Sequence, residues 1–250
     1  MTTTRFVVTS EHGGNEVPDR YASLFSSPGA KRDLHSHRGH DPGSLHAATQ
    51  LSLMLESPLI FSTTTRLLVD LNRSLDHPHL FSKYTRSQPE AEKRAILDEY
   101  FHPYRKRVED KIHTLLQTCD RVVHLSMHTF TPRFRGSRRA IDLGILYDPE
   151  RSEENRFCHE TVNHMTLLAP RRRIRHNEPY LGIDDGLTTY LRTQHPAHRY
   201  VGIEIEINNR YARWQEKQKQ TLITQLARTL QNDSCDLQNS FCRPVDTRAK

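Results

Sequence analysis

Long apolar runs are missing from this sequence of 250 residues, and no window approaches the roughly 18 consecutive apolar residues that a membrane span requires. Hydrophobic residues make up only 35% and charged residues 26%, which is polar for a globular protein but outside the range of a disordered chain. Residues 1–5 lead directly into the strand-like stretch 6–9, without the basic region, apolar core and cleavage site of a secretory signal. We therefore expect a folded cytoplasmic protein with no membrane partner.

Cysteine is scarce as well. Cys119, Cys158, Cys235 and Cys242 show no two-residue spacing between any pair. Such a set neither builds a disulfide framework nor forms a zinc knuckle, so free thiols are expected.

Linkers rich in Pro, Gly or Ser and internal repeats are also absent. The chain is therefore expected to form a single α/β domain over residues 1–232. After residue 232 the apolar periodicity ends, which predicts an irregular tail over residues 233–250.

Histidine is the residue that the sequence has in excess, with 16 copies, and it is the commonest side-chain ligand of transition metals. The formal net charge is +6, but lysine and arginine are scattered and form no aromatic-interleaved stripe. This scatter argues against a nucleic-acid partner. The sequence leaves the oligomeric state open.

Short β-rich runs alternate with helical patterns along the chain, which predicts a mixed, mostly parallel sheet with helices on both faces, that is, a three-layer α/β fold. The expected strands are residues 5–10, 59–62, 67–71, 121–127, 140–146, 172–176 and 200–207. The expected helices are residues 43–55, 90–118 with a bend at Pro103, 153–168, 186–193 and 211–231.

In open α/β sheets, ligands bind beyond the carboxyl ends of the strands, so the residues that follow each strand are the candidates for a site. Glu11, His12, Asn15 and Glu16 follow the first strand and offer metal-binding or proton-transferring groups; a polar turn that caps a helix is the alternative. His128 ends a buried-strand pattern. A lone histidine at such a position is more often a core residue. Because His12 also follows a strand, the two histidines together could bind a metal.

Three further segments carry candidate chemistry. In the segment 66–74, Asn72 and Arg73 could hold a carboxylate, or Asp70 and Arg73 could form a structural ion pair. Glu204 and Glu206 share one face of a strand: at a sheet edge they would face solvent, whereas in a central strand burial would raise the pKa of one toward that of a general base. The polar segment 177–189 predicts either a lid or recognition loop, or an ordinary connection to a helix.

Taken together, six short segments in this order resemble the N-formylglutamate amidohydrolase family. They are EHGGN at residues 11–15, DPG at 41–43, VDLNR at 69–73, MHTF at 127–130, NEPY at 177–180 with DG at 185–186, and EIE at 204–206. The resemblance implies a phosphorylase/hydrolase-like fold of the zinc-carboxypeptidase and aspartoacylase kind, with one bound Zn²⁺.

The resemblance also implies a role for each matching residue. His12 and His128 match the zinc-binding histidines, and Glu206 matches the catalytic glutamate, with Glu204 the alternative. Arg66 is a second anion or oxyanion contact. The expected substrate-binding residues are Asn72, Arg73, Asn177, Tyr180 and Asp185.

The third metal ligand departs from the zinc-carboxypeptidase pattern. Those enzymes place a glutamate three residues after the first histidine, where this chain has Asn15. The carboxylate must then come from Asp41, Glu16 or Glu11, and Asp41 is favoured because the family also has an acid at that helix start.

The implied activity is zinc-dependent hydrolysis of the amide bond of N-formyl-L-glutamate or a similar N-acyl amino acid. Such a substrate is small and anionic, which agrees with the basic excess of the chain. The alternatives are a metal-dependent carboxypeptidase or amidase that acts on another acylated substrate, and a non-catalytic metal-binding protein of the same fold.

Overall fold

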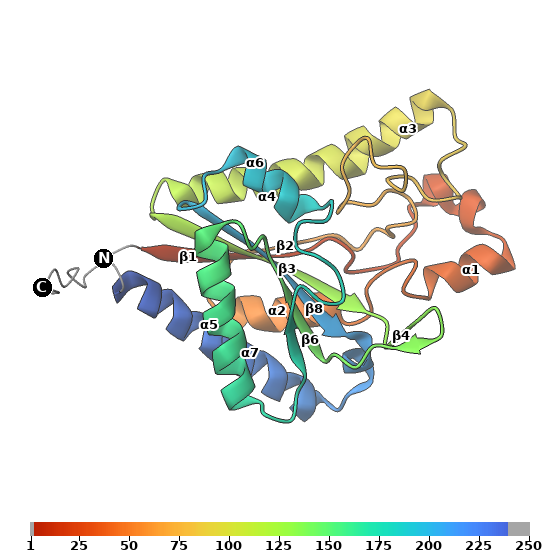
Figure 1. Cartoon of the computed structure of the whole chain (residues 1–250). Helices are drawn as coiled ribbons and strands as arrows, with labels where there is room; N and C mark the ends of the chain where they lie inside the picture. Colours follow the sequence, from red (N-terminus) through yellow and green to blue (C-terminus); the bar gives the residue numbers. More distant parts are fainter. Residues whose placement is uncertain (1–2, 240–250) are drawn as a thin grey trace, which may run out of the picture.

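The computed structural model describes residues 3–239 and is built on a six-stranded sheet with the order β2-β1-β3-β8-β6-β7 (Figure 1). Strands β2, β1, β3 and β8 run parallel, β6 is antiparallel to β8, and β7 is parallel to β6. This is the expected mixed, mostly parallel sheet. The strands are β1 (Thr4–Ser10), β2 (Leu59–Phe61), β3 (Arg121–Phe130), β6 (Leu143–Leu146), β7 (Ile174–His176) and β8 (Tyr200–Asn208).

Helices cover both faces of the sheet (Figure 1). One face carries α2 (Ser44–Met54), α5 (Ser152–Leu168) and α7 (Glu216–Asn239). The other carries α3 (Glu90–Ile96), α4 (His102–Leu116) and α6 (Leu187–Gln194). Shorter elements are η1 (Asp19–Phe25), α1 (Pro28–Leu34), the hairpin β4 (Arg133–Phe134) and β5 (Ser137–Arg138), and η3 (Asn209–Arg213). Within residues 3–239, no helix combines the length and the apolar character needed to cross a membrane.

The two faces of the central strands differ because side chains alternate along a strand. Toward α2, α5 and α7, β3 and β8 present mainly buried apolar residues, among them Leu125, Met127, Ile203 and Ile205; Arg121 and Thr129 near the two ends of β3 are the polar exceptions. Toward α4 and α6, the same strands begin apolar and become polar at their carboxyl ends. The apolar face therefore supplies the packing that holds the strands, and the other face is left to form a site.

The expected long helix over residues 90–118 is present as α3 and α4 joined by one π-helical turn, η2 (Leu97–Phe101). The backbone N–H of His102 donates to the carbonyl of Leu97, five residues back. Pro103 follows directly and has no N–H to donate, so it tolerates the start of a new helical segment but not its interior. The predicted irregularity at Pro103 is thus a π turn that ends two residues before it.

Residues 67–71 do not form the expected strand. The N–H of Leu68 donates to Thr65 and that of Asp70 donates to Leu80, so the backbone is satisfied by turns instead of a ladder. Leu68, Val69 and Leu71 are buried in the core, which is why their apolar run resembles a strand in the sequence.

The C-terminal helix also differs from expectation. It begins at Glu216 after η3 and continues to Asn239, past residue 233 where an irregular tail was expected. The remainder of that tail, residues 240–250, lies outside the described residues.

A buried ion pair joins α5 and α6 to the central strand β8. The guanidinium of Arg192 on α6 donates from Nε to both carboxylate oxygens of Glu154 on α5, at 3.1 and 3.0 Å. It also donates to the carbonyls of Gly182 and Gly202, and Glu154 accepts from the N–H of Gly202. The pair thus joins α5, α6, β8 and the loop 177–186.

We expect Glu154→Gln to lower the free energy of unfolding by about 3 kcal/mol, because it leaves the charge of Arg192 buried without its partner. Chemical denaturation monitored by circular dichroism would measure the change. Glu150→Gln, at an exposed position on the same stretch, should stay within about 0.5 kcal/mol of the original protein. Equal stability of the two variants would contradict the role given to the pair.

Candidate active site

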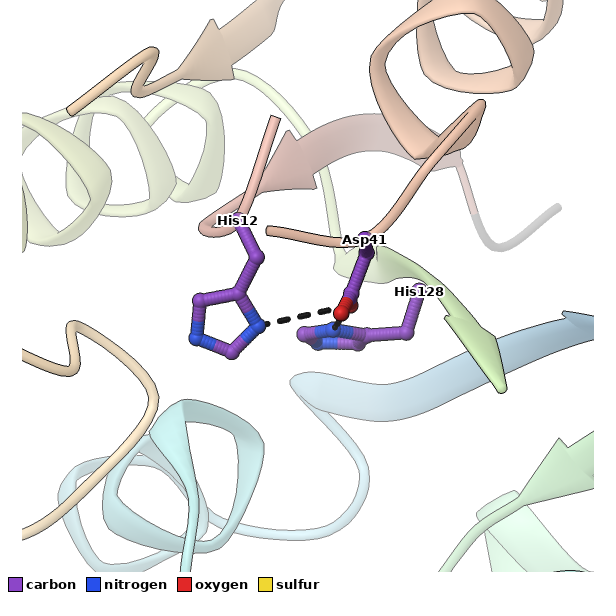
Figure 2. A group of neighbouring side chains, drawn as sticks. All are labelled: His12, Asp41 and His128. Carbon is purple, nitrogen blue, oxygen red and sulfur yellow. Dashed lines mark hydrogen bonds and ion pairs between the residues drawn. The ribbon is translucent and has the colours of Figure 1, made fainter. Parts of the chain in front are cut away.

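The polar ends of β1 and β3 and one loop bring three metal-binding side chains together (Figure 2). His12 follows β1, His128 lies near the end of β3, and Asp41 comes from the segment before α2. The carboxylate oxygen Oδ2 of Asp41 lies 3.3 Å from Nδ1 of His12 and 2.9 Å from Nδ1 of His128. All three residues are buried, and one ligand atom from each lies within 4.8 Å of the others.

The backbone explains why Asp41 reaches this position. Its N–H donates to the carbonyl of His12 at 2.9 Å, which pins the loop against the end of β1. Gly43 caps α2 with φ of 88°, a left-handed conformation that favours glycine. The DPG segment therefore turns the chain into α2 directly after Asp41 has been placed beside the two imidazoles.

Each imidazole is held on its opposite side by a second carboxylate. Nε2 of His12 lies 2.7 Å from Oδ1 of Asp70, and Nε2 of His128 lies 3.2 Å from Oε2 of Glu11. Carboxylates of this kind fix the tautomer and ring orientation of histidines that bind metals. Both rings thus direct Nδ1 toward Asp41, so that the two nitrogens and the Asp41 carboxylate could bind the same metal ion.

The supporting carboxylates are themselves fixed and ionised. Arg66 donates from Nη2 to Asp70 at 2.6 Å and from Nη1 to Asp41 at 3.4 Å. Although burial opposes ionisation, Arg66 and His12 hold the pKa of Asp70 well below its usual range, and His12 and His128 do the same for Asp41. The pKa of Glu11 is likewise low because His128 outweighs the effect of burial.

These residues suit a divalent transition metal. Two imidazole nitrogens and one carboxylate oxygen form the donor set of catalytic zinc sites that keep a fourth position open. Of the alternatives for the third ligand, Glu16 does not join the group: it is exposed and accepts a hydrogen bond from Thr63 at 2.6 Å. Glu11 lies behind His128, where Tyr104 and Ser126 donate to it.

Glu206 is the buried carboxylate of the site that has no partner. β8 lies between β3 and β6, so it is a central strand, and its register places Glu206 opposite His128. The oxygen Oε2 is buried without a hydrogen bond among the described residues. Burial raises the pKa of Glu206 to about 8, and the carboxylates of Asp41 and Glu204 add to the rise. A group of this kind can hold or release a proton near neutral pH.

Glu204, two residues earlier on the same face, is engaged differently. Its Oε1 accepts a hydrogen bond from Thr188 on α6 at 2.9 Å, and a side chain at Gly186 would collide with it, since a Cβ there would lie 2.9 Å away. Glu204 therefore anchors the start of α6, whereas Oε2 of Glu206 makes no such contact among the described residues.

Asn72 and Arg73 follow Asp70 in the chain, and Nδ2 of Asn72 lies 3.4 Å from Nε2 of His128. Arg73 donates from Nη1 to the carbonyl of Asp185 at 2.8 Å, and its guanidinium remains about 30% exposed. Asn72 accepts from the N–H of Leu187 at 2.6 Å. The alternative ion pair between Asp70 and Arg73 is not formed, because Asp70 pairs with Arg66 while Arg73 faces Asp185.

A cavity of about 210 Å³ joins these groups. Of the residues that the sequence suggested, it is lined by His12, His128, Asp41, Glu206, Glu204, Arg66, Asn72, Arg73, Tyr180 and Asp185. Asn177 does not line it; instead its amide oxygen accepts from the N–H groups of Tyr147 and Gly182. Asn177 thus braces the loop 177–186 against β6.

Sequence reasoning missed the roles of Asp70 and Glu11 behind the imidazoles, and of Phe130, Phe134 and Leu181 in the cavity wall. Asp70 and Glu11 stand beside recognised motif residues, but only their spatial relation to His12 and His128 shows what they contact.

Comparisons with known proteins agree with this arrangement. A model of the N-formylglutamate amidohydrolase family matches residues 4–212. A solved gene product of Agrobacterium tumefaciens has the same fold with a TM-score of 0.81 and 24% identity, over 95% of this chain and 93% of that one. A solved N-formylglutamate amidohydrolase of Ralstonia eutropha superposes with a TM-score of 0.65 and 18% identity, over 96% of each chain. No curated protein matches the sequence.

We expect the protein to bind one Zn²⁺ and His128→Ala to lose stoichiometric binding, because two donors hold zinc weakly. Asp70→Asn should weaken zinc affinity about 10-fold to 100-fold, since it loosens the orientation of His12. Metal content after dialysis and calorimetric titration with zinc would measure both effects. His113→Ala, an exposed histidine on α4, serves as the control and should bind as the unchanged protein does. Unaltered zinc binding by His128→Ala would show that the metal sits elsewhere.

Proposed function

Since this chain belongs to the N-formylglutamate amidohydrolase family, we propose that it is a zinc-dependent hydrolase of the amide bond in N-formyl-L-glutamate or a similar N-acyl amino acid. The observation that supports this most is the placement of His12, Asp41 and His128 in one cavity with a buried carboxyl group, Glu206, that has no hydrogen-bond partner at Oε2. The first three offer a metal site, and the fourth offers proton transfer beside it.

His12, His128 and Asp41 would hold the ion through Nδ1, Nδ1 and a carboxylate oxygen. The chemistry that zinc supplies at such a site is polarisation of the scissile carbonyl and a lowered pKa for water. Asp70 and Glu11 keep the imidazoles turned toward the ion, and Arg66 keeps Asp70 and Asp41 ionised.

Glu206 performs both proton transfers of the hydrolysis. As a general base it accepts a proton from the water that attacks the amide carbon. The protonated carboxyl group then donates to the departing nitrogen as the carbon–nitrogen bond breaks, which leaves the acyl carboxylate and the free amino acid. A pKa raised toward neutrality suits a group that must take and return a proton in one cycle.

Arg73 and Asn72 would bind the carboxylate of the amino-acid half. Arg73 carries a partly exposed guanidinium whose hydrogen bond to the carbonyl of Asp185 orients it at the cavity wall. A guanidinium presents paired N–H groups to a carboxylate, so it selects anionic substrates by geometry as well as charge.

The rim of the cavity favours an acyl group larger than formyl. Phe134, Tyr180 and Leu181 line the cavity while remaining between 41% and 52% exposed. An apolar acyl chain would cover more of this exposed apolar surface than a formyl group, which has a single carbon. We therefore keep N-acyl amino acids with longer acyl groups as candidate substrates together with N-formyl-L-glutamate.

We expect Glu206→Gln to lower kcat/KM about 100-fold to 10,000-fold, because it removes the group that transfers protons while keeping its shape. Release of amine from N-formyl-L-glutamate by the zinc-loaded protein measures the rate, and metal content shows whether zinc is retained. Glu99→Gln, an exposed position, is the matched control. Full activity of Glu206→Gln with zinc bound would refute the proposed role.

We expect N-acyl glutamates and aspartates to be cleaved faster than N-acyl histidines, and Arg73→Met to raise KM for the acidic substrates about 10-fold to 100-fold through the loss of a charge-assisted hydrogen bond. Steady-state kinetics over such a panel, with formyl and longer acyl groups, would test this. Arg32→Met, at an exposed arginine that does not line the cavity, should leave KM unchanged. If acidic and neutral substrates were cleaved at the same rate, the carboxylate-binding role proposed for Arg73 and Asn72 would be wrong.

A further inference from the structure

A second cavity, of about 660 Å³, opens beside α4 and α6 and shares no lining residue with the candidate active site. Its apolar walls include Leu75, Phe101, Pro103 and Tyr190. Arg105, on α4, lines it as well and is only 6% exposed. A buried arginine in an apolar cavity requires an explanation, since a buried charge is costly unless it is paired.

Arg105 is poorly paired compared with the other deeply buried arginines. Arg192 has Glu154 within 3.0 Å and Arg121 has Glu153 within 2.5 Å. Among the described residues, no carboxylate oxygen lies within 4.0 Å of the nitrogens of Arg105. Its Nη2 donates to the carbonyl of Arg73 at 2.7 Å, and its Nε is buried with no partner. Burial lowers the pKa of Arg105, although the more distant carboxylates of Glu11 and Asp185 act in the opposite direction.

Aromatic rings hold the guanidinium in place. Its central carbon lies 5.0 Å from the ring centre of Phe101 and 5.2 Å from that of Tyr190, distances at which a cation is attracted to an aromatic ring. These contacts fix the orientation of Arg105 but neutralise none of its charge.

The other charged groups of the cavity are engaged elsewhere. Lys106 forms an ion pair with Asp110 at 2.9 Å. Glu109 interacts with the hydroxyl of Tyr190 and, together with burial, raises the pKa of that phenol. Of Arg105 and Lys106, only Arg105 therefore has no described partner of opposite charge in direct contact.

We propose that this cavity binds a small organic acid with an apolar body, whose carboxylate pairs with Arg105 and whose hydrocarbon part packs among Leu75, Phe101 and Tyr190. A carboxylate in the cavity would supply the ion-pair partner that no described residue places within 4.0 Å of the guanidinium. An apolar body suits walls of this composition and a cavity of this size. The site does not depend on the hydrolase activity proposed above.

Calorimetric titration of the full chain with 4-phenylbutyrate tests the proposal, with 4-phenylbutyramide as the neutral ligand of the same shape. We expect saturable one-to-one binding of the acid and at least tenfold weaker binding of the amide. Arg105→Met should weaken binding of the acid at least tenfold, whereas Arg94→Met, an exposed arginine on the neighbouring α3, should not change it.

Leu75→Glu keeps Arg105 in place and adds a carboxylate at the partly exposed wall of the cavity. It should also weaken binding at least tenfold, and it gives a second test if Arg105→Met unfolds. Arg73→Met should retain binding. The proposal is overturned if the acid does not saturate the protein, if the amide binds equally well, or if Arg73→Met loses binding while Arg105→Met and Leu75→Glu keep it.

Discussion

Ionised carboxylates buried beside imidazoles at the ends of β1 and β3 are the constraint on which the rest of this structure depends. Asp41, Asp70 and Glu11 are all buried, and each is held in its ionised form by cationic neighbours. Such a cluster costs free energy, because charges lose hydration when they leave water. This cost is offset by the opposite face of the same strands, which is mostly apolar and packs against α2, α5 and α7. One face of the sheet thus stabilises the protein, and the other can be devoted to chemistry.

Much of the fold could be predicted from the sequence because helices and strands impose their own periods on apolar residues. The segment 67–71 shows the limit of that reasoning: its residues are as buried as those of a strand, but their backbone groups are satisfied by turns, and burial alone does not distinguish the two. The C-terminal helix shows another limit, since its backbone remains helical beyond the last turn with clear apolar periodicity.

The candidate site divides in the same way. His12 and His128 could be expected to meet because each follows or ends a strand of a parallel sheet, where such ends share one edge. Asp41 comes from a loop, and only the resemblance to a family favoured it over Glu16. Choosing between Glu204 and Glu206 required the hydrogen bond that engages Glu204 with Thr188, which no sequence pattern displays. Asn177, placed by motif among the substrate contacts, instead supports the loop backbone.

The position of β8 in the sheet has a consequence for biosynthesis. This strand is the last of the sheet in chain order, yet it pairs with β3 on one side and β6 on the other. Until residues 200–208 have left the ribosome, β3 and β6 each present an open edge of unpaired N–H and carbonyl groups, the kind of surface on which chains aggregate. The nascent protein must therefore protect these two strands while the residues between β6 and the end of β8 are added. Assembly of the whole sheet, with Glu206 beside His128, is completed in one late step.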